Sequence, residues 1–173
     1  MLGLPKGQVF LVPWTEQWEI EFNEEEKNIR IEINDDILAI HHIGSTAIKG
    51  LSAKPIIDIA IEIKLFESGI NCVEGLEKIG YSYKGTDVLP DRHYFNKGEP
   101  RTHQIHMYQT GSEYLNKQLM LRDYLRTNDI ARLKYQELKE RLSKENSEDK
   151  LAYADAKTDF VNKIISAADR RRQ

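Results

Sequence analysis

Two stretches near the start of the chain show the apolar patterns of core β-strands. Residues 37–43 form a largely apolar run that leads into the turn Gly44-Ser45-Thr46. In residues 57–63, isoleucine at every other position faces one side, and polar or small residues face the other. The pattern predicts two core strands, with the carboxylate of Asp58 held on the open face of the second.

Helical spacing is found on both sides of these strands. A helix predicted after Thr15 has inward residues Trp18, Phe22, Ile29 and Ile33 and a solvated face of Glu24, Glu25, Glu26, Lys27 and Arg30. A second helix is predicted to begin at Ser68 and to end at Gly80. Its side chains that face the core are expected to be Ile70, Val73, Leu76 and Ile79.

A hairpin and a helical region complete the pattern. Residues 81–83 alternate as a strand, 85–92 are expected to form an exposed loop, and 94–95 and 101–108 are expected to pair across a turn at 96–99. From Ser112 the chain is predicted to be helical, with one helix to Thr127, one from a cap at 128–129 and one after residue 150. The inward residues of the middle helix are expected to be Ile130, Leu133, Leu138 and Leu142.

The order of these elements is α-β-β-α-β-β-β-α-α-α, which predicts the α+β class. We expect a mixed β-sheet packed with helices and a helical C-terminal third. A chain of 173 residues is long enough to bury a core of its own, so residues 1–173 are expected to form a single domain.

The composition of the chain argues against several classes of protein. The net charge of −3 provides no general attraction for nucleic acid or anionic membrane, so neither is expected as a partner. Cys72 stands alone, which excludes an intramolecular disulfide and a cysteine-based zinc site. The apolar runs are too short to span a membrane, and the start of the chain lacks the order of a signal peptide. A cytoplasmic protein is therefore expected.

The loop between the two core strands contains the main candidate chemistry. Gly44, Ser45 and Thr46 are small residues that allow a phosphate to approach the backbone, and Lys54 lies in the loop that follows. Asp58 is the candidate metal ligand, and the tentative metal is Mg²⁺. The alternatives are a plain turn for 44–46 and, for Asp58, a polar residue that caps a neighbouring backbone group.

Two histidines on the last predicted strand fall on opposite faces. His106 is expected to face the same open side as Asp58, if their strands are neighbours, and is a candidate base or electrostatic partner. His103 shares the face of Ile105 and is expected to be a satisfied core histidine. No third histidine or cysteine accompanies them at a known zinc spacing.

Basic residues on the inward faces of the predicted helices are candidates for binding an anionic ligand. Arg122 and Arg126 continue an apolar stripe, and Lys157 lies between two aromatic residues of the last helix. Each could extend its charged end to solvent, pair with a buried carboxylate such as Asp123 or Asp155, or meet an anionic ligand. Arg92, in the predicted exposed loop, is a weaker candidate for a mobile clamp over the site.

Several of these motifs resemble those of the GrpB-like family. They are His42-Ile43-Gly44-Ser45-Thr46-Ala47, Gly50-Leu51, Lys54-Pro55-Ile56-Ile57-Asp58-Ile59, Arg101-Thr102-His103-Gln104-Ile105-His106 and Leu121-Arg122-Asp123-Tyr124-Leu125-Arg126. The resemblance continues in residues 135–139 and 153–157 and at the Pro13-Trp14 start, so that it covers nearly the whole chain. It implies a nucleotidyltransferase-like fold of the polymerase-beta type and a link to nucleotide or cofactor metabolism.

In that superfamily a strand with two alternating acids binds magnesium, and this chain departs from the pattern. Ala60 stands where the second acid is expected, and the third strand offers Gln104 and His106. One carboxylate leaves room for a single Mg²⁺ but not for full two-metal catalysis.

Two hypotheses follow. The first is a Mg²⁺-dependent nucleotidyltransferase that acts on a phosphate-containing small molecule, with phosphate held at Gly44, Ser45, Thr46 and Lys54, the metal at Asp58, His106 as base or electrostatic partner, and Arg122 or Lys157 opposite the developing charge. The second is a non-catalytic module that binds or senses a nucleotide or coenzyme A precursor and has a degenerate active site.

Overall fold

The computed structural model describes residues 1–145 and 150–172. The strands are β1 Ile37–Ile43, β2 Ile57–Ile63, β3 Tyr81–Tyr83, β4 His93–Lys97 and β5 His103–Gln109. The helices are α1 Gln17–Ile33, α2 Val73–Lys78, α3 Glu113–Thr127, α4 Asp129–Glu145 and α5 Lys150–Arg172, with short 3₁₀ helices η1 Asn34–Asp36, η2 Ser45–Ala47 and η3 Phe66–Cys72. β1 and β2 begin and end where the sequence predicts.

The five strands form one mixed sheet in the order β1-β2-β5-β4-β3. β2 runs antiparallel to β1 and parallel to β5, which in turn pairs antiparallel with β4 as the predicted hairpin. The α+β class and the mixed sheet are therefore confirmed. Because β2 and β5 are direct neighbours, Asp58 lies opposite Gln104, and Ala60 lies opposite His106.

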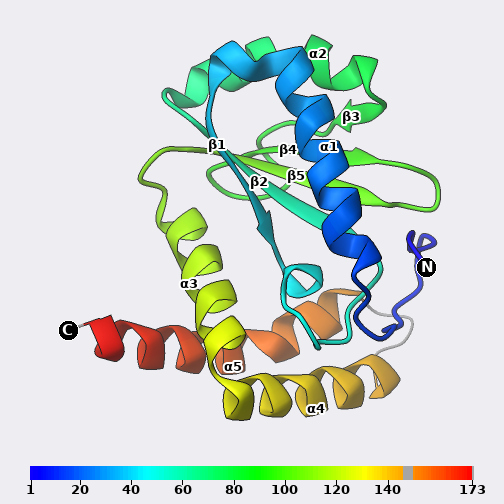
Figure 1. Ribbon diagram of the computed structural model, residues 1–173, viewed down its shortest axis with the longest axis vertical. Helices are drawn as coiled ribbons and strands as arrows, with labels where there is room; N and C mark the ends of the chain where they lie inside the picture. The colour runs from blue at the N-terminus through cyan, green and yellow to red at the C-terminus, as the bar shows by residue number, and fades with distance from the viewer. Residues whose placement is uncertain (146–149, 173) are drawn as a thin grey trace.

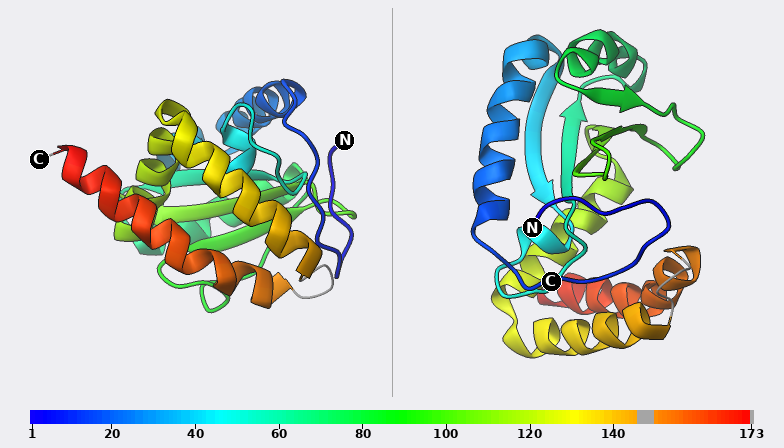
Figure 2. Two further views of the ribbon diagram at one scale, coloured as in Figure 1. Left: turned by 90° about the horizontal axis from the view of Figure 1, so that it is seen from below. Right: turned by 90° about the vertical axis from the view of Figure 1, so that its right-hand side faces the viewer.

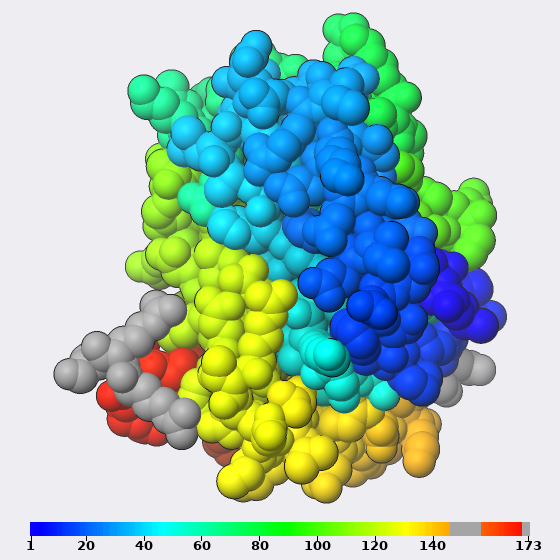
Figure 3. Space-filling model, in the orientation of Figure 1, coloured from blue at the N-terminus to red at the C-terminus, as the bar shows by residue number. Residues whose placement is uncertain are grey.

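One face of the sheet is the main core. Ile57, Ile59, Ile61 and Ile63 are each fully buried there and pack against α1 and α2. The inward stripe of α1 is confirmed, since Trp18 and Ile29 are also fully buried. In Figure 3, α1 covers the sheet from the front. Burial of these apolar side chains is the main favourable contribution to the free energy that keeps β2 in the core of the sheet.

The other three helices gather at one end of the sheet. Figures 1 and 2 show α4 and α5 side by side beyond the end of β1 and the start of β2, with α3 leading down to them. A cluster around Ile48, Leu51 and Leu125 joins this helical layer to the loop between β1 and β2. A second cluster, of Ile43, Ala60, Tyr108 and Leu115, joins it to the sheet. This packing places the helical third over the end of β2 that carries Asp58.

Four predicted orientations are wrong. Ile70 is 55% exposed, because residues 66–72 form a 3₁₀ helix with three residues per turn, and the α-helix begins only at Val73. Ile130 and Leu133 are 69% and 62% exposed, because α4 packs through its other side, which carries Tyr135 and Lys139. Glu25, predicted to be solvated, is buried.

None of the helices in residues 1–145 and 150–172 combines the length and apolar character that a bilayer crossing requires.

Candidate functional site

A cleft of about 440 Å³ lies where the helical layer meets the sheet. Its walls are the η2 turn, the loop before β2, the starts of β2 and β5, and the inner sides of α3, α4 and α5. It brings together all of the predicted site residues, which are Gly44, Ser45, Thr46, Lys54, Asp58, His106, Arg122 and Lys157. Residues more than 100 positions apart in sequence therefore share one cavity.

The Gly44 turn forms one wall against the carboxylate of Asp58. Gly44 has φ +72°, a conformation that costs little only for glycine, and it begins the single turn of η2. Ile43 is the register partner of Asp58 across β1 and β2. A β-carbon at position 44 would lie 2.6 Å from Asp58 Oδ2. Oδ2 therefore faces the turn directly.

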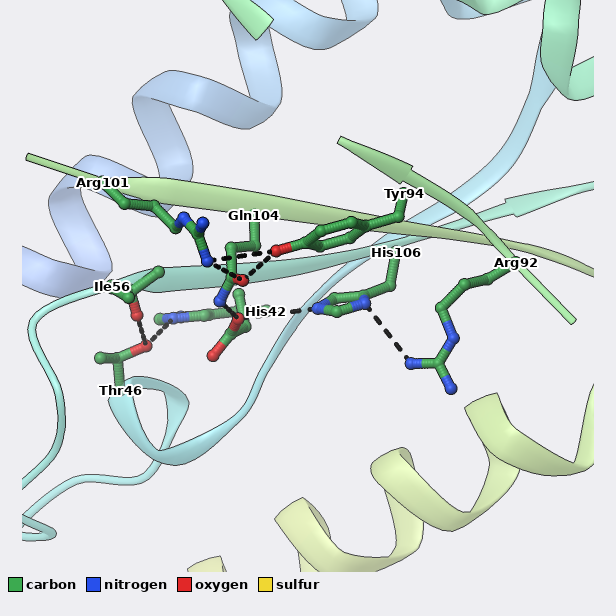
Figure 4. A network of polar contacts seen from close by, with 9 residues as sticks. His42, Thr46, Ile56, Arg92, Tyr94, Arg101, Gln104 and His106 are labelled. Atoms are coloured by element: carbon green, nitrogen blue, oxygen red, sulfur yellow. Dashed lines mark hydrogen bonds and ion pairs between the residues drawn. The ribbon is translucent and has the colours of Figure 1, made fainter. Parts of the chain in front are cut away.

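The other carboxylate oxygen, Asp58 Oδ1, faces β5. Gln104 Nε2 donates to Oδ1 at 2.9 Å, and His106 Nε2 lies 3.7 Å from the same atom (Figure 4). The expectation that His106 shares the open side with Asp58 is correct in geometry. His106 Nδ1 lies 3.4 Å from the guanidinium of Arg92.

Arg92 is not a residue of an exposed loop. It is 8% exposed, donates to the carbonyl of Pro90 and lies over the rings of Tyr108 and Tyr114. The prediction of a mobile clamp is wrong, because these contacts hold the guanidinium in place beside His106 Nδ1.

His103 is buried on the core face, as predicted, but is only half satisfied. Its Nδ1 lies 2.9 Å from Thr102 Oγ1, whereas its Nε2 has no hydrogen-bond partner among the described residues.

The arginines of α3 tie the helical layer to the turn. Arg122 forms an ion pair with Asp123 at 2.8 Å and donates to the carbonyl of His42 at 3.1 Å, so the expected pairing with Asp123 is confirmed. Arg122 also lines the cleft. Arg126 donates to the carbonyl of Ala47 at 2.9 Å. Lys157 lines the cleft, and the side chain of Asp155, its other candidate partner, lies outside the described residues.

Lys139 is a cleft residue that the sequence analysis missed. It is 2% exposed, donates to the carbonyl of Ser52 and lies over the ring of Tyr135. Burial, together with Lys157 and Lys54 nearby, holds its pKa well below the usual range. Its place four residues after Tyr135 was an available signal, because residues at that spacing share one face of a helix.

The position expected for a second acid is filled by apolar side chains. Ala60 is fully buried in the cluster with Ile43, Tyr108 and Leu115, against which Leu119 packs. In the described part of the chain, no group of three or more histidine, cysteine, aspartate or glutamate residues is arranged to hold a metal ion. The cleft lining thus offers one carboxylate together with several basic side chains.

The sequence as a whole matches one family model, described as GrpB protein, over residues 8–167. The chain belongs to the GrpB family. The glutamate-rich protein GrpB of Alkalihalophilus pseudofirmus is 32% identical, over 96% of this chain and 99% of that protein. YqkA of Bacillus subtilis is 35% identical over 96% of this chain, which spans only 49% of that relative.

Solved structures show the same fold. The crystal structure of GrpB from Enterococcus faecalis matches with a TM-score of 0.87 and 31% identity, over 94% of this chain and 99% of that one. Terminal uridylyl transferase 4 from Trypanosoma brucei with bound dUTP matches with a TM-score of 0.59 and 10% identity, over 92% of this chain and 55% of that one. Cid1 with the UTP analogue UMPNPP matches with a TM-score of 0.54 and 13% identity, over 76% of this chain and 42% of that one. This GrpB family member therefore has a nucleotidyltransferase-like fold.

Proposed function

We propose that the cleft binds the phosphate groups of a nucleotide or a related small molecule, together with a single Mg²⁺. The observation that carries this proposal is the arrangement around Asp58: its Oδ2 faces the Gly44-Ser45 turn, and cationic side chains line the same cavity. Those cations are Lys54, Arg122 and Lys157, and the buried amine of Lys139 lies in the same lining. A phosphate chain carries several negative charges, and this lining offsets them in a partly enclosed site.

The residues fit one Mg²⁺ and do not fit two. Mg²⁺ in phosphate sites is commonly held by one or two carboxylates, with phosphate oxygens and waters as the remaining ligands. The Asp58 side chain is 26% exposed and can supply such an oxygen, whereas Ala60 is closed off by apolar neighbours. A bound Mg²⁺ would neutralise charge on the phosphate oxygens.

The reaction that fits this arrangement is nucleotidyl transfer to the hydroxyl of a small acceptor. The hydroxyl oxygen bonds to the α-phosphorus, the bond from that phosphorus to the bridging oxygen breaks, pyrophosphate leaves, and the hydroxyl proton passes to water. Arg122 and Lys157 stabilise the negative charge on the departing phosphates. His106 Nδ1 faces the guanidinium of Arg92, which can only donate, so this nitrogen is occupied as an acceptor and does not serve as the base. His106 acts instead as an electrostatic partner of Asp58 through Nε2.

A second candidate function is a non-catalytic module that binds a nucleotide or coenzyme A precursor. The apolar packing around Ala60 favours it, because full two-metal catalysis needs a further carboxylate at that position. The two candidates share the ligand and differ in turnover. The likeness to uridylyl transferases is at 10–13% identity and supports the fold alone.

A thermal-shift and calorimetry screen tests the binding proposal. Nucleoside triphosphates, diphosphates and coenzyme A precursors are tested with and without Mg²⁺. A ligand at 100 times its Kd should raise the free energy of unfolding by about 2.7 kcal/mol. Ser45→Ala, Asp58→Ala and Lys157→Met should each weaken that effect. Lys163→Met, an exposed lysine of the same helix outside the cleft lining, is the control.

Unchanged binding of Mg²⁺-nucleotides by Asp58→Ala and Ser45→Ala would refute the binding proposal. Release of pyrophosphate then separates the two candidates. Mg²⁺-dependent release with a mixture of hydroxyl acceptors establishes the transferase, and ligand binding without release or Mg²⁺ dependence establishes the module.

A further inference from the structure

The side-chain amide of Gln104 can adopt only one orientation. Its Oε1 accepts a hydrogen bond from the Tyr94 hydroxyl and lies 3.4 Å from the guanidinium of Arg101. Its Nε2 donates to Asp58 Oδ1 at 2.9 Å. A flipped amide would set N–H groups against Arg101, which can only donate, and an oxygen against the carboxylate. The orientation is therefore fixed from both ends.

Arg101 also orients the hydroxyl that takes part in this contact. Its guanidinium lies 3.5 Å from the Tyr94 oxygen, and as a pure donor it leaves the Tyr94 proton to point at Gln104 Oε1. The backbone of Arg101 pairs separately with Leu4. Its side chain can be changed while that backbone pairing is kept.

The two oxygens of Asp58 therefore have different surroundings. Oδ1 receives an N–H from Gln104 and faces His106, whereas Oδ2 faces the Gly44 turn. Asp58 and Gln104 are register partners on the hydrogen-bonded strands β2 and β5, so the backbone of the sheet places the donor and the acceptor opposite each other.

We propose that Arg101 is a positioning residue of the cleft. By fixing the amide of Gln104, it holds an N–H donor on Asp58 Oδ1 and leaves Oδ2 as the single oxygen that meets a divalent cation at the Gly44 turn. The cation part rests on the function proposed above, whereas the orientation of the amide does not. Outer groups that orient a ligating carboxylate typically change metal affinity by about 10- to 100-fold when they are removed.

The sign of the effect separates positioning from simple electrostatics. Removal of a positive charge near the cleft should by itself tighten the binding of a cation. Loss of positioning should weaken it, because Asp58 is then free to turn. We therefore expect Arg101→Met to weaken Mn²⁺ binding about 10-fold. Arg101→Lys, which keeps a donor, should stay within about threefold of the wild type.

The experiment has two readouts on the intact chain. Mn²⁺ affinity is measured by paramagnetic resonance or calorimetry. Independently, the side-chain amide signal of Gln104, assigned by its loss in Gln104→Met, is recorded by NMR without metal. Arg141→Met removes a charge whose side chain is 65% exposed, and it is the control for both. Melting temperatures confirm that each variant is folded.

Weaker Mn²⁺ binding and a displaced amide signal in Arg101→Met, with both restored by Arg101→Lys, support the proposal. Equal or tighter Mn²⁺ binding in Arg101→Met overturns it, and so does an unmoved amide signal. If the wild type binds no Mn²⁺, the cation part of this proposal fails, whereas the Mg²⁺ role that depends on bound phosphate is decided by the nucleotide screen described above. The amide signal then decides the positioning of Gln104 by itself.

Discussion

Lys97 Nζ lies 2.9 Å from Glu25 Oε1 and 3.1 Å from Oε2, on the face of the sheet opposite the cleft. The pair joins β4 to the middle of α1 beneath Tyr81, and the Glu25 residue is 5% exposed. Burial alone would raise the pKa of Glu25, but the hydrogen bond and charge of Lys97 outweigh it and hold the pKa below its usual value. The carboxylate is therefore charged, with Lys97 as the cation that pairs with it and Asn28 Nδ2 as a neutral donor 3.4 Å from Oε2.

Lys97→Met should destabilise the protein by about 3 kcal/mol at pH 7, because it leaves a buried carboxylate without its cation. In the wild type the Glu25 carboxylate contributes stability above pH 4.5, its ordinary pKa, and loses it as the pH falls through the lower folded value. The penalty of the variant should therefore shrink towards pH 4. Urea unfolding at pH 7 and pH 4 measures both effects. Lys27→Met, at an exposed position of α1, is the control, and an equal penalty at both pH values would contradict the argument.

The sheet face of each strand residue could be predicted from the sequence, because side chains along a strand alternate between the two faces. That rule placed Asp58 and His106 on one open side before their distance was known. It could not place Glu25 or Lys139. Both are charged residues on helices, and each is buried by a partner more than 70 positions away in sequence. A charged residue on a helix is ordinarily predicted to be solvated, and the place of Lys139 four residues after Tyr135 was the local signal against that prediction.

The local sequence pattern also could not predict which side of a helix faces the core where the helix type changes, or how a polar side chain is oriented. The turn to 3₁₀ geometry before Val73 shifted Ile70 outward, although its spacing suits an α-helix. The donor role of Gln104 depends on Arg101 and Tyr94, which the β4–β5 hairpin brings together. The sequence shows that an amide is present, and only the assembled sheet decides which of its atoms meets Asp58.

Gly44→Ala should disable the cleft more than it destabilises the fold. The added methyl group meets Asp58 Oδ2 at 2.6 Å and must displace the carboxylate, in addition to a cost of about 1–3 kcal/mol for a backbone with φ +72° and ψ −173°, a region essentially restricted to glycine. Gly111→Ala is a matched control, with φ +81° and nothing within 4 Å of its added β-carbon. Both variants place a side chain at a positive φ and should lose stability from backbone strain, and only Gly44→Ala should lose the Mg²⁺-nucleotide thermal shift. Retained ligand binding by Gly44→Ala would show that Oδ2 is not used.

His42 should make stability fall in mild acid. It is 8% exposed, stacks on Phe22 and lies 3.0 Å from Thr46 Oγ1 through Nε2. Burial lowers its pKa to about 4, with Asp58 opposing the shift and Arg126, Arg122 and His103 adding to it.

A base whose folded pKa lies below its unfolded value of 6.5 gives full stability above pH 6.5 and loses it as the pH falls towards 4. Between pH 7 and pH 5 this single group should therefore cost about 2 kcal/mol. His42→Gln removes the titration and keeps a side chain that can donate. Chemical denaturation at the two pH values should show a flatter profile for the variant, and an equal drop in both proteins would assign the acid sensitivity to other groups.

Ala60→Asp should fail to restore a second metal ligand. The new carboxylate would enter the space among Ile43, Tyr108 and Leu115, where helix α3 packs on the sheet, and burial of a charge in such surroundings costs about 3 kcal/mol or more. Ala60→Ser separates size from charge and should cost only about 1 kcal/mol. Urea unfolding and Mn²⁺ titration of the three proteins test this directly. Tighter Mn²⁺ binding by a stable Ala60→Asp would show that α3 yields to a second acid, and the apolar packing would then no longer argue for the non-catalytic module.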